Sequence, residues 1–120
     1  DRFAASQAAR RSQRMAWGVA DDECLIVHVG RMEAWKGQAF LLEALATFRP
    51  VTRWRCWLVG GPQSPPERAY HAHLLHLVER LGLADRVRLL GQRDDVPALL
   101  AAAEVCCQPN LAPEPFGGAL

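Results

Sequence analysis

Apolar and polar positions follow two different periods along the chain, and each change of period predicts a boundary between a strand and a helix. The run Cys24-Leu25-Ile26-Val27-His28-Val29 is almost continuously apolar and ends at Gly30. Such a run is typical of a strand that is buried on both faces. Between Lys36 and Phe48 the apolar residues instead recur at helical spacing, at positions 40, 41, 44, 45 and 48.

The same two patterns alternate along the rest of the chain. Strands are predicted at 24–29, 54–59, 86–90 and 105–108, and helices at 4–17, 36–48, 66–81 and 94–103. We expect Gly82 to end the third helix and either Asp94 or Asp95 to cap the fourth. Strands that alternate with helices through short connections build a parallel sheet with right-handed crossovers. The sequence therefore predicts an α/β fold.

Ligands of open parallel sheets bind beyond the carboxyl ends of the strands. Here those ends carry Gly30-Arg31, Gly60-Gly61, Gly91-Gln92-Arg93 and the segment 109–118. A glycine follows each of the first three strands, so backbone can approach a ligand closely at this edge.

Two cations lie in the first of these connections, between a strand end and a helix start. Lys36 is expected near the positive end of a helix dipole, where a cation is favourable only if an anion docks there too. Arg31 supplies a planar fork that suits phosphate oxygens, so the two residues could bridge a pyrophosphate. In the alternative interpretation, Glu33 pairs with Lys36 and Arg31 is a solvated loop charge. The sequence contains neither Gly-x-Gly-x-x-Gly nor a Walker motif.

The last residues form a second candidate site. Pro113 and Pro115 stiffen the backbone on both sides of Glu114. Phe116 and the pair Gly117-Gly118 follow, where a starting helix leaves backbone N–H groups unpaired. A carboxylate beside free donors suits the hydroxyl groups of a sugar. The alternative is a proline-rich turn that places Glu114 favourably near a helix N-terminus.

The composition is that of one ordinary globular domain. The chain has 120 residues and a net charge of +1, which gives no bulk attraction to nucleic acid or anionic lipid. No apolar run approaches the roughly 18 residues that a membrane helix needs. The four cysteines lie in apolar runs without Cys-x-x-Cys spacing, which favours buried thiols in a reducing compartment. We expect a cytoplasmic protein.

Taken in order, the motifs resemble one known family. They are Gly-Arg-x4-Lys-Gly (30–37), Val-Gly-Gly (59–61), Arg-Val-x2-Leu-Gly (86–91), Asp-Asp-Val-Pro-x-Leu-Leu-x2-Ala-Glu-Val (94–105) and Pro-Asn-x2-Pro-Glu-Pro-Phe-Gly-Gly (109–118). Together they resemble the C-terminal, nucleotide-sugar-binding domain of the retaining "group 1" glycosyltransferases, which have the two-domain GT-B fold. The resemblance implies a Rossmann-like open parallel sheet with helices on both faces over residues 22–120, preceded by a lead-in helix over 1–21.

The resemblance also implies roles for individual residues. Arg31 and Lys36 would hold the diphosphate of a nucleoside diphosphate sugar and assist its departure, with Gly30 beside them. The turn Gly91-Gln92-Arg93 would line the base pocket. Glu114 would bind hydroxyls of the transferred sugar.

The backbone amides of Phe116, Gly117 and Gly118 would contact the same sugar and its phosphate. Because cations and a helix dipole stabilise the leaving group in this family, neither a metal nor any other cofactor is expected.

In the family Glu114 begins a Glu-x7-Glu signature, whose second acid would fall two positions beyond Leu120. We therefore expect a truncated C-terminal half of a GT-B enzyme that is inactive alone. Its acceptor-binding N-terminal domain, through which peripheral membrane contact could occur, would be elsewhere. A truncated sheet would also expose an edge, through which two copies could dimerise.

Two other classes of protein are alternatives. The chain could be a non-catalytic nucleotide-sensing or interaction module on the same fold. A flavodoxin-like signalling domain with Asp94 and Asp95 as its acidic site is disfavoured, because no acid ends the first strand.

Two further expectations concern packing. Arg10, Arg11 and Arg14 are predicted on a solvated helix face, and Trp54 and Trp57 on opposite faces of the sheet.

Overall fold

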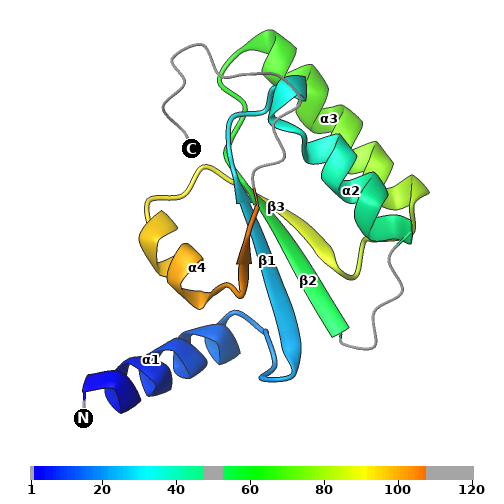
Figure 1. The fold of residues 1–120 in the computed structure, drawn as a ribbon. Helices are drawn as coiled ribbons and strands as arrows, with labels where there is room; N and C mark the ends of the chain where they lie inside the picture. The colour runs from blue at the N-terminus through cyan, green and yellow to red at the C-terminus, as the bar shows by residue number, and fades with distance from the viewer. Residues whose placement is uncertain (1, 48–52, 108–120) are drawn as a thin grey trace.

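The computed structural model describes residues 2–47 and 53–107 (Figure 1). Its elements are α1 (Arg2–Ala16), β1 (Glu23–Val29), the 3-10 helix η1 (Ala34–Lys36), α2 (Gln38–Thr47), β2 (Arg53–Val59), α3 (Pro65–Arg80), β3 (Val87–Gly91), α4 (Val96–Ala102) and β4 (Val105–Cys106). The predicted alternation of strands and helices is confirmed. None of the helices in these residues is long and apolar enough to cross a membrane.

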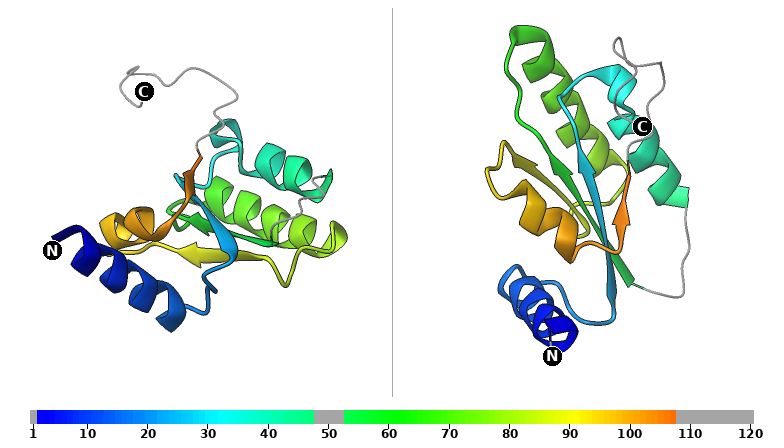
Figure 2. Two further views of the ribbon diagram at one scale, coloured as in Figure 1. Left: turned by 60° about the horizontal axis from the view of Figure 1, so that its bottom comes forward. Right: turned by 60° about the vertical axis from the view of Figure 1, so that its left-hand side comes forward.

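All four strands run parallel in one sheet, in the order β3-β2-β1-β4. Figure 2 shows α2 and α3 together on one face of the sheet and α1 and α4 on the other. After β3 the chain crosses to the opposite side of β1, so the winding direction reverses between β1 and β4. The fold is therefore the expected α/β fold, with a Rossmann-like open parallel sheet and helices on both faces.

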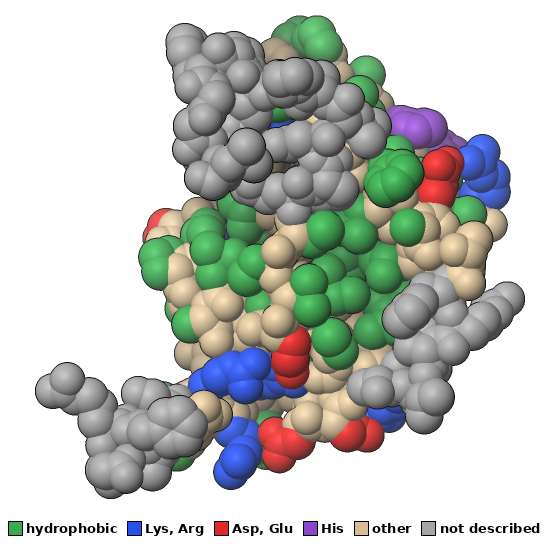
Figure 3. Space-filling model, in the orientation of Figure 1, with side chains coloured by type: hydrophobic (Ala, Val, Ile, Leu, Met, Phe, Trp, Pro, Cys, Tyr) green, Lys and Arg blue, Asp and Glu red, His purple; other side chains and the backbone are tan. Residues whose placement is uncertain are grey.

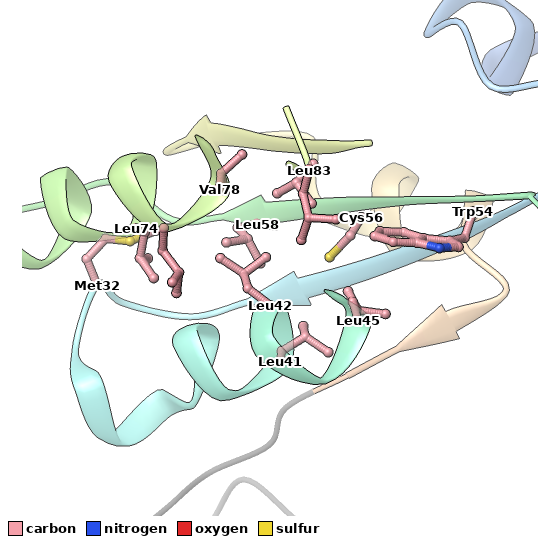
Figure 4. Packing of buried hydrophobic residues seen from close by; sticks show 12 residues of the cluster. Met32, Leu41, Leu42, Leu45, Trp54, Cys56, Leu58, Leu74, Val78 and Leu83 are labelled. Carbon is pink, nitrogen blue, oxygen red and sulfur yellow. The ribbon is translucent and has the colours of Figure 1, made fainter. Parts of the chain in front are cut away.

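The larger core lies between the sheet and the pair α2 and α3 (Figure 4). Leu42 of α2 meets Leu58 of β2 and Leu74 of α3, and all three side chains are fully buried. The predicted apolar stripe of α2 is wrong at Phe40, which is 55% exposed, and at Ala44, which is exposed too. The helix begins only at Gln38, and its buried face instead carries Leu41, Leu42 and Leu45. Phe40 lies two residues from Leu42, roughly 200° around the helix. Phe48 lies outside the described residues.

A second core covers the other face of the sheet. Trp57 packs there with Leu25 and with Leu99 of α4, whereas Trp54 belongs to the first core. The opposite orientation of the two tryptophans is therefore confirmed. Trp17, just after α1, meets Trp57 edge to face with ring centroids 5.5 Å apart, which joins α1 to this layer.

The predicted solvated face of α1 is wrong for Arg14, whose residue is only 2% exposed. Its guanidinium donates to the carboxylate of Glu104 and to the carbonyl oxygens of Ala20, Glu23 and Ala102. The helix end packs against the amino end of the sheet, where these acceptors gather. Figure 3 shows basic and acidic side chains meeting at the bottom of the view, in the region where α1 passes this end of the sheet.

Candidate functional site

A pocket of about 250 Å³ opens at the carboxyl ends of β1, β2 and β3. Its walls come from three strand ends and the segments after them: residues 29–31, 59–61 with Gln63, and 92–93 with Val96. The sheet topology explains the location, because parallel strands bring all their carboxyl ends to one edge. The sequence predicted a site at this edge, and the structure contains a pocket there.

The glycines make the pocket by letting strand ends approach one another. Gly60 has a φ of +132°, and a Cβ on it would lie 1.9 Å from the carbonyl oxygen of Gly30. Backbone bonds join the same segments: Gly30 N–H donates to the Val59 carbonyl and Gly60 N–H to the Gly91 carbonyl, at 3.0 and 2.8 Å. Only glycine fits at position 60, and the wall there is bare backbone that a ligand can reach.

Arg31 lies at the pocket wall and is held from several sides. Its Nη2 donates to Oε2 of Glu67 at 2.6 Å, and its Nε lies 3.3 Å from Oε1 of Glu33. Its carbonyl accepts from Nε2 of Gln38 at 2.7 Å. The Arg31 side chain nevertheless remains 57% exposed, so part of the guanidinium faces solvent. This arrangement differs from a freely solvated loop charge.

Glu67 is the residue that sequence reasoning missed. It lies in the first turn of α3, and its side chain is 7% exposed. Its Oε1 accepts from the backbone N–H of Gln63, and its Oε2 accepts from Ser64 and Arg31. Burial alone would raise the pKa of this carboxyl, but the hydrogen bonds and the charge of Arg31 outweigh it and lower the pKa below its ordinary value. The signal was present, because Ser64-Pro-Pro-Glu67 has the spacing of a capping box.

The position of Lys36 relative to the helix differs from the prediction. It ends the 3-10 helix η1, and Gly37 then takes a left-handed conformation before α2 begins. Lys36 is therefore not in the first turn of α2, and its Nζ lies 4.3 Å from the ring centroid of Trp35. Glu33, the partner of Lys36 in the alternative interpretation, contacts Arg31 and accepts from Trp35 Nε1 at 2.6 Å. Lys36 is not among the residues that line the pocket, but its side chain passes beside Gly30, which does: its Cγ and Cδ lie 3.7 Å from where a Cβ on Gly30 would stand.

Two buried polar side chains fix the loop that joins β1 to α2. His28 Nε2 lies 2.9 Å from the Lys36 carbonyl oxygen, so this nitrogen carries the proton. Burial disfavours the charged ring and lowers the pKa of His28 below its ordinary value. Gln38 binds the carbonyl of Arg31 at the other end of the loop. Within the described part of the chain, His28 Nδ1 and Gln38 Oε1 have no hydrogen-bond partner.

The connection after β3 supplies the last wall. Gln92 is exposed, while Arg93 donates through Nε and Nη2 to the two carboxylate oxygens of Asp95, at 2.9 and 2.6 Å. Asp95 occupies the predicted cap position of α4, but its side chain makes no cap hydrogen bond. The hydrogen bonds from Arg93 hold the pKa of Asp95 below its ordinary value.

The structure thus gathers part of the predicted site. Among the residues singled out from the sequence, Gly30, Arg31, Gln92 and Arg93 line the same pocket. The Gly91 carbonyl accepts a hydrogen bond from the Gly60 N–H, and Gly91 does not line the pocket. The predicted residues Glu114, Phe116, Gly117 and Gly118 lie outside the described residues.

The family model for "Glycosyl transferases group 1" matches residues 23–120. This chain belongs to the group 1 glycosyl transferase family. Its parallel sheet has the Rossmann-like arrangement found in GT-B glycosyltransferases. The family expectation drawn from the motif order is therefore confirmed at the level of the family and the fold.

Relatives of this chain include D-inositol 3-phosphate glycosyltransferases. That of Corynebacterium glutamicum is 30% identical over 116 residues, which are 92% of this chain and 27% of the relative. That of Mycobacterium tuberculosis is 33% identical over 110 residues, which are 90% of this chain and 22% of the relative. The chain thus spans about a quarter of the length of these relatives.

A solved structure, Anabaena Alr3699/HepE in complex with UDP and glucose, superposes with a TM-score of 0.81. The two are 37% identical, and the match covers 92% of this chain and 29% of that one. The same Anabaena protein has also been solved with UDP-glucose.

Proposed function

We propose that residues 22–120 are the C-terminal, donor-binding domain of a retaining glycosyltransferase that transfers a sugar from a nucleoside diphosphate to an acceptor bound by another domain. The observation that carries the proposal is the pocket at the carboxyl ends of β1, β2 and β3, with the guanidinium of Arg31 held at its wall. The likeness to a protein solved with UDP-glucose supports the ligand class. The chain alone is not expected to catalyse transfer.

The chemistry follows from charge. As the glycosidic bond breaks, negative charge grows on the diphosphate, and cations already in place stabilise it without reorganisation. Two unit charges 4 Å apart attract by about 4 kcal/mol at an effective dielectric constant of 20. In this proposal Arg31 and Lys36 supply the two cations, so no metal ion and no other cofactor is needed. The same two cations would thus strengthen binding of the donor and stabilise the transition state in which its diphosphate departs.

The remaining roles follow the path of the donor along the strand ends. Gly30 and Gly60-Gly61 let the diphosphate approach backbone, and the turn Gly91-Gln92-Arg93 contacts the base. Glu114 and the amides of residues 116–118 bind the transferred sugar.

Calorimetric titration of UDP against the full-length protein tests the proposal. Arg31→Ala should weaken UDP binding about 10- to 100-fold, because a hydrogen-bonded charge pair is lost. Arg53→Ala is the matched control, since Arg53 has a similar 59% exposed side chain at the amino end of β2. No UDP binding by the wild type, or equal binding by Arg31→Ala, would refute the site. UDP binding without sugar transfer would favour the alternative of a nucleotide-sensing module.

A further inference from the structure

Arg31 lies between two carboxylates that differ in how firmly they are themselves held. Glu33 belongs to the same loop, its side chain is 31% exposed, and it approaches Nε at 3.3 Å. Glu67 comes from α3, its side chain is 7% exposed, and it accepts from Nη2 at 2.6 Å. The second contact is the shorter of the two and has the more buried partner.

The carboxylate of Glu67 has little freedom to turn. Oε1 accepts from the backbone N–H of Gln63 at 3.1 Å, and Oε2 accepts from the Ser64 hydroxyl at 3.2 Å. Both Gln63 and Ser64 lie between β2 and the first turn of α3, and Gln63 itself lines the pocket. Glu67 is therefore anchored to one wall of the pocket while it contacts a cation of the neighbouring wall.

Arg31 is consequently restrained at both ends. Gln38 holds its carbonyl oxygen at 2.7 Å, and Glu67 holds one terminal nitrogen of its guanidinium. Among residues 2–47 and 53–107, the partners of the Arg31 guanidinium contact Nε and Nη2, which leaves the Nη1 side of the planar fork for a ligand. A long side chain fixed in this way loses less conformational entropy when an anion binds.

We propose that Glu67 is a positioning residue for the donor: its anchored carboxylate holds the Arg31 guanidinium so that the remaining N–H groups face the diphosphate. This role rests on the proposed function of the pocket. It also predicts a change in anion affinity that is opposite in direction to the change expected from Coulomb attraction alone. Removing a negative charge beside an anion site should tighten anion binding by Coulomb attraction, whereas loss of positioning should weaken it.

The test is UDP titration of the full-length wild type, Glu67→Gln and Glu33→Gln. Both variants remove one negative charge next to the same guanidinium, so they form a matched pair. Glu67→Gln should weaken UDP binding about 3- to 10-fold, the cost of ordering a long side chain. Glu33→Gln should bind UDP as tightly as the wild type or more tightly. Unchanged or tighter binding by Glu67→Gln would overturn the role.

A double-mutant cycle separates positioning from general damage to the fold. If Glu67 acts through Arg31, adding Glu67→Gln to Arg31→Ala should weaken UDP binding no further. An equal loss in both backgrounds would show that Glu67 only stabilises α3. Leu77→Ala is the structural control, because it weakens the buried face of α3 ten residues beyond Glu67 and should leave UDP binding unchanged. If Glu67→Gln fails to fold, Glu67→Asp keeps the charge, retracts the carboxylate and should also weaken binding.

A second readout keeps this role distinct from the proposed function. Nitrogen-15 NMR of the Arg31 side chain should show hindered guanidinium rotation in the wild type and free rotation in Glu67→Gln. Absence of UDP binding by the wild type, with this NMR difference intact, refutes the donor site but not the ordering of Arg31. Free rotation in the wild type refutes the positioning role even if UDP binds.

Discussion

Arg14 and Glu104 lie 90 positions apart in the sequence, yet Nη1 of the arginine is 2.6 Å from both carboxylate oxygens. The same guanidinium donates through Nη2 to the carbonyls of Ala20 and Glu23, at 3.1 and 2.7 Å. Glu104 in turn accepts from the backbone N–H of Leu25 in β1. One buried cation therefore joins α1, the start of β1 and the segment before β4, at the end of the sheet opposite the pocket.

Arg14→Ala should lower the free energy of unfolding by about 2–3 kcal/mol, because buried carbonyls and a carboxylate lose their donor. The loss stays below that of a fully buried pair, since the Glu104 side chain is 35% exposed and water can reach it. Urea unfolding followed by circular dichroism measures the change. Arg11→Ala is the control: its contact with Asp21 is exposed, and its loss should cost under about 1 kcal/mol. Equal effects of the two variants would contradict the role of Arg14.

Gly60→Ala should destabilise the protein by about 3 kcal/mol or more, because its Cβ would overlap the Gly30 carbonyl and force two strand ends apart. Gly82→Ala also places a side chain at positive φ, but nothing lies within 4 Å of its Cβ. That control should cost only about 1–2 kcal/mol. Thermal unfolding of both variants separates the steric clash at position 60 from the cost of a side chain at positive φ. Similar losses of stability in the two variants would contradict the close approach of Gly60 to the Gly30 carbonyl.

Leu42→Ala should cost about 2–5 kcal/mol, because it opens a cavity between α2, β2 and α3. Phe40→Ala removes a larger side chain from the same helix, but that side chain is mostly exposed and the change should cost about 0.5 kcal/mol. Denaturant midpoints of the two variants decide which face of α2 is inward. A greater loss for Phe40→Ala would mean that the helix is rotated.

Stability should fall as the pH drops below about 6.5. His28 has a lowered pKa in the folded protein, so below its ordinary pKa the unfolded chain binds a proton that the folded chain does not. The stability that the neutral, buried His28 contributes is fully present above that pH. Below it, the free energy of unfolding declines by at most about 1.4 kcal/mol per pH unit. His28→Gln keeps an N–H donor for the Lys36 carbonyl and should flatten the profile between pH 5 and 6.5, as measured by urea unfolding. A slope unchanged in the variant would assign the effect to another group.

The order of strands and helices could be predicted from hydrophobic periodicity, because a strand or helix must bury its apolar face wherever it lies in a fold. Periodicity could not place Phe40 correctly. Residues 39–42 are all apolar, so the pattern leaves open which of them face the sheet, and the packing of α2 against β2 and α3 decides it.

The pocket edge could also be predicted, because glycines and cations after parallel strands converge by topology alone. The partners of Arg31 and Arg14 could not, since Glu67 and Glu104 lie 36 and 90 positions away. No local pattern encodes such distant pairs. The capping-box spacing could have identified Glu67 as a helix residue, but not as the partner of Arg31.

The strand order β3-β2-β1-β4 also governs when each part can form during synthesis. The strands that end at the pocket pair as sequential neighbours, and the pocket's lining residues are complete at Val96. Only later does the chain return across the sheet to supply Glu104 and β4. During synthesis the residues that line the pocket therefore emerge before Glu104 and β4, whose contacts with Arg14 and β1 have to wait for the last part of the described fold.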